Sequence, residues 1–233
     1  MSLFSELIYL FYPEVCAACD NQLVRGEEFI CLSCHYHLPK TDFHLFRDNP
    51  LARSFWGKLP IENAAAYLFF NKGEKVQKLI HNFKYRGQTE LGVYLGKLYG
   101  LLLIDVPLFQ QADFVIPVPM HSTKKEKRGF NQSEIFASGL ALSMKKEFGP
   151  DFLRKKSATE TQTNKSSYQR WENVKDIFEL ASEEVYNLLQ GKHVILVDDV
   201  VTTGSTLEAC ASALLKVPGI RISMVTMAYA NKI

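Results

Sequence analysis

Two adjacent carboxylates and a run of hydroxyl side chains around one glycine form the stretch of this chain best suited to chemistry. Asp198 and Asp199 follow four apolar residues at 194–197, three of them β-branched. Such a short apolar run is typical of a buried strand. Beyond the loop, apolar residues at helical spacing predict a helix over 207–216. The loop itself consists of Thr202, Thr203, Gly204, Ser205 and Thr206.

This order of elements predicts a phosphate-binding loop with two carboxylates at its edge. Gly204 lets backbone N–H groups turn inward, the hydroxyls can donate, and the start of the helix adds partial positive charge. Asp198 and Asp199 are poor neighbours for phosphate but suit sugar hydroxyls or Mg²⁺. A ligand carrying phosphate, ribose and metal satisfies both halves. The alternative is an ordinary strand-to-helix turn with Asp and Thr caps, which needs only one such residue.

The composition describes an ordinary globular protein. The chain has 233 residues, of which 47% are hydrophobic and 22% charged, and its formal net charge is +2. This length suits one large α/β domain, or a medium-sized domain with a small module. The charge argues neither for nor against nucleic acid as a partner. No apolar run approaches the ~20 residues of a membrane helix, so we expect a cytoplasmic protein without a membrane span and interpret residues 3–12 as an amphipathic docking helix.

Four of the five cysteines lie within the first 34 residues, in the pattern C-x2-C-x11-C-x2-C. Two such pairs typically supply four thiolates to a tetrahedral structural Zn²⁺. The predicted ligands are Cys16, Cys19, Cys31 and Cys34. A redox pair, two disulfides or pairs that have lost the metal are the alternatives. Cys210, on the apolar face of the predicted last helix, is interpreted as a small apolar residue of the core.

The rest of the chain alternates predicted strands and helices. Strands are expected over 64–70, 113–118, 194–197 and 220–229, and helices over 74–83, 91–104, 133–147, 183–189 and 207–216. Residues 38–60 are predicted as a linker with a short helix at 51–56. Pro117 and Pro119 fix a rigid turn at the end of one strand. Ligands gather at the carboxyl ends of parallel strands, so this turn and the Asp198 loop could face one crevice.

Basic residues stand at two places where they could contact an anion. Arg128 precedes Gly129 and a predicted helix start, which suits an anion clamp. The polar tract 154–173 is predicted to be a mobile lid, and Arg170 within it is a second clamp. The basic clusters 124–128 and 154–156 are solvated surface or a site for single-stranded nucleic acid, with nearby aromatic side chains for stacking.

The order of these motifs resembles the ComF family, and the Asp198 stretch resembles the signature for phosphoribosyl pyrophosphate (PRPP) of type I phosphoribosyltransferases. The matching pieces are the two C-x-x-C pairs, 83–87, 117–119, 128–132, 198–206, and Arg154, Gln162, Arg170, Asn173 and Phe178. The resemblance implies an α/β fold with a mostly parallel sheet flanked by helices. It also implies three parts: a helix and zinc-ribbon-like module over 1–40, a linker over 41–60 and a phosphoribosyltransferase-like domain over 61–233. The departure is the lysine-rich loop after Pro119, which opens with Met120.

The resemblance further implies roles for the site residues. The 202–206 loop would hold the 5′-phosphate, and Asp198 and Asp199 the ribose hydroxyls, with Mg²⁺ bridging them to pyrophosphate. Val118 and Pro119 would form the facing wall, and Arg128 and Arg170 would clamp pyrophosphate, while Lys84 is a further candidate for the crevice.

The reaction would be displacement at C1 of PRPP through an oxocarbenium-like transition state. The implied setting is bacterial uptake of single-stranded DNA during natural transformation. The alternatives are a non-catalytic PRPP sensor, a single-strand-binding protein, and a scaffold that recruits a helicase or translocation protein. The sequence leaves the acceptor and the occurrence of catalysis open.

Overall fold

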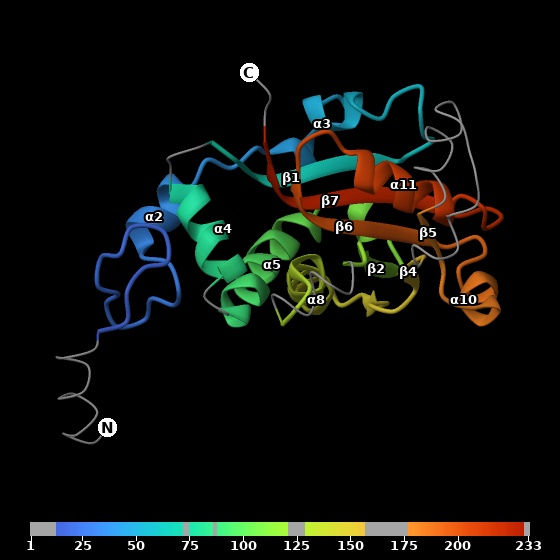
Figure 1. Cartoon of the computed structure of the whole chain (residues 1–233). Coiled ribbons are helices and arrows are strands. Elements are labelled where there is room, and N and C mark those ends of the chain that lie inside the picture. The colour runs from blue at the N-terminus through green and yellow to red at the C-terminus, as the bar shows by residue number, and fades with distance from the viewer. Residues whose placement is uncertain (1–12, 72–74, 86–87, 121–128, 157–176, 231–233) are drawn as a thin grey trace, which may run out of the picture.

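A parallel five-stranded sheet, in the order β1-β7-β6-β2-β3, forms the middle layer of the protein (Figure 1). The computed structural model describes residues 13–71, 75–85, 88–120, 129–156 and 177–230, and every structural statement below concerns these. The strands are β1 (Asn63–Phe69), β2 (Phe114–Pro117), β3 (Glu147–Phe148), β6 (His193–Val201) and β7 (Arg221–Tyr229).

The central strands are apolar because both faces of the sheet are covered. Residues 194–197 of β6 have no exposed surface, and 222–228 of β7 are buried throughout. Parallel strands covered on both faces typically read as continuous apolar runs. The predicted α/β class with a mostly parallel, helix-flanked sheet is therefore confirmed.

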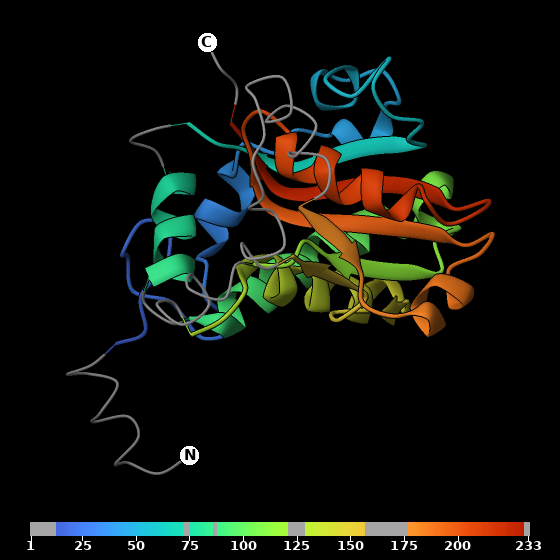
Figure 2. The same ribbon diagram turned by 45° about the vertical axis from the view of Figure 1, so that its right-hand side comes forward.

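Two helices, α5 (Thr89–Leu103) and α8 (Gln132–Met144), lie against each other along one face of the sheet, and α11 (Ser205–Leu214) lies on the opposite face (Figure 2). Glycines allow α5 and α8 to approach closely. A Cβ atom at Gly96 would stand 2.2 Å from the carbonyl oxygen of Phe136, and one at Gly139 would stand 2.2 Å from that of Val93. Any larger residue at either position would push the two helices apart and would therefore displace the start of α8.

The predicted linker segment packs onto the edge of the sheet. Within 41–60 the chain forms η1 (Phe43–Leu45) and α3 (Pro50–Arg53), and Phe43, Leu51 and Phe55 are buried. Asn49 caps α3 by accepting from the backbone N–H of Ala52, and its side-chain amide donates to the carbonyl of Ala64 in β1. The predicted division into three parts stays a prediction.

The remaining elements lie at the ends and edges of the sheet. They are α2 (Leu32–His37), α4 (Lys75–Tyr85), α6 (Pro107–Gln110), α10 (Glu183–Leu188), and the antiparallel pair β4 (Leu153–Lys155) and β5 (Phe178–Leu180). In both views α4 stands beside the sheet and next to the cysteine-bearing segment, which it contacts through Lys78 and Asn82 (Figures 1 and 2). No helix among the described residues is long and apolar enough to cross a membrane.

The element boundaries differ from the prediction in two informative places. Strand β6 continues through the acid pair to Val201, because Asp198 and Val200 still pair with β7. The helix predicted to reach Glu147 ends at Met144, where Lys145 takes a left-handed conformation (φ 54°) and Glu147 joins β3. The predicted helix at 3–12, Arg128, Arg170 and most of the predicted lid lie outside the described residues.

Candidate functional site

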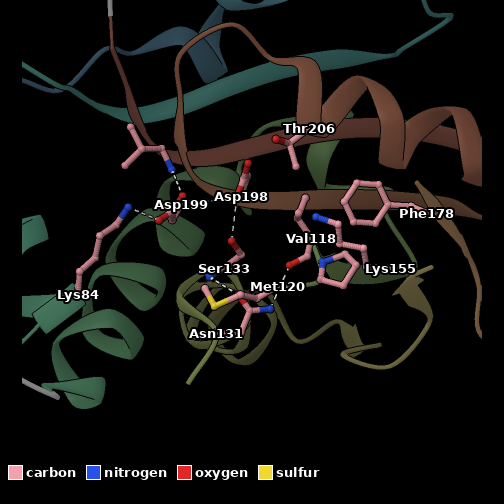
Figure 3. A pocket seen from close by; sticks show the side chains of 12 residues that line it. Lys84, Val118, Met120, Asn131, Ser133, Lys155, Phe178, Asp198, Asp199 and Thr206 are labelled. Carbon is pink, nitrogen blue, oxygen red and sulfur yellow. Dashed lines mark hydrogen bonds and ion pairs between the residues drawn. The ribbon is translucent and has the colours of Figure 1, made fainter. Parts of the chain in front are cut away.

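The acid pair lies at the carboxyl end of β6, where open parallel sheets bind their ligands (Figure 3). Asp198 is half-buried, and its Oδ1 accepts hydrogen bonds from the hydroxyl of Ser133 (2.9 Å) and from the backbone N–H of Asp199 (2.9 Å). Burial and the neighbouring charge of Asp199 raise the pKa of Asp198 to about 6, although those hydrogen bonds and Lys84 act against the shift. Asp198 thus changes charge close to neutral pH.

Asp199 is held by a cation from another element. Its Oδ2 forms an ion pair with the ammonium group of Lys84 on α4, and its Oδ1 accepts from the backbone N–H of Val200 at 2.6 Å. Both charged side chains are largely buried, since only 17% of the Lys84 side chain and 18% of the Asp199 side chain are exposed. The ion pair therefore ties α4 to the acid pair.

The hydroxyl-rich loop leads directly into α11. Gly204 adopts φ +77°, a conformation that side-chain-bearing residues rarely take. The Thr203 and Ser205 hydroxyls lie 3.0 Å apart, and the hydroxyl-bearing residues of the loop are all exposed. Phe55 packs under the loop, because a Cβ atom at Gly204 would stand only 2.8 Å from its ring. Exposed hydroxyls at the first turn of a ten-residue helix suit a bound phosphate.

A wall of residues after β2 faces the acid pair across a cavity of about 330 Å³. Val118, Pro119 and Met120 line it, together with Asn131 and Ser133 at the start of α8. The side chain of Asn131 accepts from the backbone N–H of Ser133 and donates to the carbonyl of Val118 (3.0 Å), so it joins the wall to α8. The N-termini of α8 and α11 thus both reach this cavity.

Lys155 brings a second cation to the same cavity. It lies at the end of β4, and its ammonium group stands 5.8 Å from the centre of the Phe178 ring, which also lines the cavity. Its neighbours Arg154 and Lys156 are instead paired with Glu179, at 2.8 Å and 3.8 Å. Of this basic cluster, Lys155 is therefore the cation directed at the site.

The predicted site residues are only partly brought together. Asp198, Asp199, Val118, Pro119 and Thr206 line the first cavity, and Thr202 lines a second cavity beside it. The roles predicted for them, and those of Arg128 and Arg170, stay predictions. Sequence reasoning missed Asn131 and Ser133 as residues of the site. An available signal was their position at the start of a predicted helix, where Asn is a typical cap.

The four cysteines of the N-terminal segment form one compact cluster. Their sulfur atoms all lie within 4.8 Å of one another, and those of Cys19 and Cys31 are 3.8 Å apart, so these cysteines are free thiols and not disulfides. Four thiolates at about 2.3 Å from a tetrahedral Zn²⁺ would stand ~3.8 Å apart. The donor set and its spacing therefore fit a metal ion of this kind.

Backbone N–H groups around the cluster favour thiolates. Those of Cys31 and Ala18 donate to the sulfur of Cys16, at 3.3 Å and 3.4 Å. Burial raises the pKa of the Cys16 thiol, but these hydrogen bonds outweigh it and lower the pKa to about 7. Burial raises the pKa of the Cys34 thiol instead. A bound cation would be needed to hold all four as thiolates.

Cys210 lies apart from the cluster, in the core. It has no exposed surface on α11, and burial raises the pKa of its thiol well above the usual range. A thiol in this environment is inert. Its prediction as an apolar residue of the core agrees with this position.

Comparison with known proteins relates the chain to one family. Residues 131–232 match the family model described as "Phosphoribosyl transferase domain". DNA utilization protein YhgH of Shigella flexneri is 29% identical, over 87% of this chain and 84% of that protein. Competence protein F of Haemophilus influenzae is 31% identical, over 61% of this chain and 63% of that protein. Competence protein ComFC of Bacillus subtilis is 24% identical, over 87% of this chain and 89% of that protein.

A solved structure, that of the allosteric regulatory enzyme of purine biosynthesis, matches with 18% identity and a TM-score of 0.40. The match covers 62% of this chain and 29% of that chain, so this protein spans less than a third of the solved one.

The parallel sheet, its acid-bearing strand and the family match define a phosphoribosyltransferase-like protein. Within this class, the similarity to DNA utilization protein YhgH, Competence protein F and ComFC supports a protein of the ComF type.

Proposed function

We propose that this protein binds PRPP with Mg²⁺ and activates it for displacement at C1. The observation that carries the proposal is the pairing of opposite chemistries in one cavity: two carboxylates at the end of β6, and hydroxyls and cations around them. A phosphorylated sugar needs both kinds of partner. Mg²⁺ commonly binds one or two carboxylates together with the phosphates of a substrate, so the acid pair also suits the metal.

The proposed roles follow from the position of each group. The first turn of α11, with Ser205 and Thr206, holds the 5′-phosphate by N–H and hydroxyl donors. Asp198 and Asp199 accept hydrogen bonds from the ribose hydroxyls. Lys155 is directed at the cavity and neutralises part of the pyrophosphate charge, while bound Mg²⁺ would stabilise the departing pyrophosphate.

In the proposed reaction, a lone pair of the acceptor forms a bond to C1 as the bond from C1 to the pyrophosphate oxygen breaks. Pyrophosphate leaves with that electron pair, and the acceptor releases its proton to solvent. Positive charge develops on the ribose ring in the transition state. The carboxylate of Asp199 stabilises this charge, because it acts in a partly buried site of low effective dielectric.

We also propose that the cysteine cluster holds Zn²⁺ and that the protein works in the use of DNA in the cytoplasm. The cluster supplies the four sulfur donors of a closed structural site. The names of the relatives refer to DNA utilization and competence, which supports a role linked to DNA uptake. Direct strand binding by the basic cluster 154–156 has weaker support, because Arg154 and Lys156 are paired with Glu179.

Pyrophosphate release tests the catalytic part of the proposal. The protein is mixed with Mg²⁺, PRPP and one nucleobase at a time, and pyrophosphate is measured. We expect release that requires a particular acceptor and is lost in Asp199→Asn but retained in Asp151→Asn, since Asp151 is an exposed acid that lines neither this cavity nor the one beside it. Binding of PRPP without release from any acceptor would exclude catalysis with these acceptors and support a PRPP sensor.

A further inference from the structure

Helix α4 contacts the cysteine-bearing segment and the acid pair at the same time. Its Asn82 side-chain amide donates to the carbonyl of Ala17 at 2.8 Å. Two residues further on, Lys84 forms the ion pair with Asp199 (Figure 3). Because successive residues of an α-helix are turned by about 100°, side chains 82 and 84 leave the helix about 200° apart. A single turn of α4 therefore joins the two sites from nearly opposite sides.

The contact of Asn82 falls within the first cysteine pair. Ala17 lies between Cys16 and Cys19, and the backbone N–H of Ala18 donates to the Cys16 sulfur at 3.4 Å. The carbonyl that Asn82 bonds thus belongs to the loop that presents two of the four sulfur atoms. A metal ion shared by the four sulfurs would fix this loop, because metal binding and the folding of such a small segment are coupled.

Asn82 is the buried part of the contact between α4 and this loop. Only 4% of Asn82 is exposed, and leaving a buried carbonyl without its donor costs more than losing an exposed ion pair. Lys78, one turn earlier on the same face, pairs with Asp20, and 37% and 58% of these two side chains are exposed. Asn82 therefore holds α4 to the loop, and Lys78 provides a matched comparison.

Close packing lets α4 carry a shift from one side to the other. Phe83, between Asn82 and Lys84 in the sequence, has no exposed surface. A Cβ atom at Gly92 of α5 would stand 2.3 Å from the Phe83 ring, so this ring fills the space against α5. Tightly packed interiors transmit strain instead of absorbing it. A change at Asn82 should therefore reach Lys84 through the helical turn that they share.

From these contacts we propose that Asn82 is a positioning residue, which places Lys84 against Asp199 and thereby couples the cysteine cluster to the acid pair. Coupling between two sites is reciprocal, so a metal ion at the cysteines and Mg·PRPP at the acid pair strengthen the binding of each other. This second statement rests on the proposed function. The link from Asn82 through Lys84 to the acid pair does not, and it can be tested without PRPP.

An NMR titration of the Asp198 carboxyl, in the full chain supplied with Zn²⁺ and without PRPP, tests this link. Of the charged neighbours of Asp198, Asp199 raises its pKa and Lys84 lowers it, so Lys84→Met should raise it further. Asn82→Ala should raise this pKa by part of that amount, because Lys84 then loses its support. Added to Lys84→Met, Asn82→Ala should cause no further rise. Lys78→Ala should titrate as the wild type does.

The combination with Lys84→Met distinguishes positioning from a general loosening of the fold. A rise in the pKa of Asp198 that Asn82→Ala causes equally with and without Lys84 would overturn the inference. A wild-type titration of Asn82→Ala, or an equal rise in Lys78→Ala, would also overturn it. Asn82→Leu keeps the branching of the side chain without its donor, so it should repeat the result of Asn82→Ala and keeps the test decisive if that variant does not fold.

A second experiment measures the coupling to Mg·PRPP. The affinity for Zn²⁺ is determined by equilibrium competition with a chromophoric chelator, with and without Mg·PRPP. We expect Mg·PRPP to tighten Zn²⁺ binding by the wild type at least about fivefold, at the lower end of typical couplings, and to have no such effect on Asn82→Ala. Asp198→Asn, which loses a carboxylate of the acid pair, controls for direct chelation of Zn²⁺ by PRPP.

The two experiments separate the inference from the proposed function. A wild type that binds Mg·PRPP without any change in Zn²⁺ affinity would overturn the coupling and leave the proposed function standing, as would equal tightening in Asn82→Ala and wild type. A wild type that does not bind Mg·PRPP, but in which Asn82→Ala raises the pKa of Asp198 only when Lys84 is present, would refute the proposed function and support the role of Asn82.

Discussion

Gly204 is the position where a single methyl group should disturb the phosphate loop most. In Gly204→Ala the new side chain would sit at φ +77°, which costs about 1–2 kcal/mol for an L-residue. The same Cβ atom would stand 2.8 Å from the ring of Phe55, which is 1% exposed and cannot move freely. Overpacking of this kind costs about 1–3 kcal/mol. We therefore expect a loss of about 2–5 kcal/mol in the free energy of unfolding, together with weaker Mg·PRPP binding.

A double-mutant cycle separates the two contributions. Phe55→Leu shortens the side chain that the new methyl group would meet, so the double variant should recover the steric part of the loss but not the backbone part. Urea unfolding of the four proteins, at equal m-values, should give a coupling energy of about 1–3 kcal/mol. Gly57→Ala is the matched control: its φ is +75° and no atom lies within 4 Å of the added Cβ. A loss at Gly204 no larger than that at Gly57, or strictly additive effects in the cycle, would refute the packing argument.

Three further predictions concern the acid pair and α4. The pKa of Asp198 is raised to about 6 in the folded protein, so folding takes up a proton there, and the stability that Asp198 contributes is present below about pH 4 and lost as the pH rises through about 6. Asp198→Asn should remove this part of the pH dependence of urea unfolding. An unchanged pH profile would contradict the raised pKa. Lys84→Met leaves the largely buried Asp199 carboxylate without its cation, so it should destabilise the protein by about 1–3 kcal/mol and raise the pKa of Asp198 further. In the same titrations Lys84→Arg should restore part of the stability and part of the pKa. Equal stability of Lys84→Met and wild type would refute the role of the ion pair. Asn82→Ala removes a buried donor to the carbonyl of Ala17 (2.8 Å), next to the cysteine cluster, whereas Lys78→Ala loses only an exposed ion pair. A chromophoric chelator should therefore remove Zn²⁺ faster from Asn82→Ala than from Lys78→Ala. Equal release rates would show that α4 does not support the cluster.

The sequence was sufficient for features that depend on neighbouring residues. The apolar run at 194–197, the acid pair and the Gly204 loop predict a strand, a ligand edge and a helix start from local chemistry alone. The spacing of the cysteines likewise predicts a four-sulfur cluster, because pairs two residues apart can present both sulfurs to one metal. Each of these arrangements lies within a single short segment.

Features that depend on tertiary packing were beyond the sequence. Lys84 and Asp199 are 115 residues apart in the sequence, and they form an ion pair only because α4 stands beside the end of β6. Ser133 bonds to Asp198 because close packing of α5 on α8 fixes where α8 begins. Phe55 was assigned to a linker, since only the folded structure places its ring under Gly204. The end of β6 was also missed, because pairing with β7 holds the polar residues of 198–201 in the strand.

Calorimetric titration with Mg·PRPP tests the central claim most directly. The wild type should bind one equivalent, with an affinity that rises from about pH 5 to about pH 7 as Asp198 loses its proton. Asp198→Asn should bind at least about tenfold more weakly at pH 7 and lose the pH dependence, whereas Asp151→Asn should bind as the wild type does. Absence of binding to the folded wild type, or equal affinity in Asp198→Asn, would contradict the assignment of this cavity to PRPP.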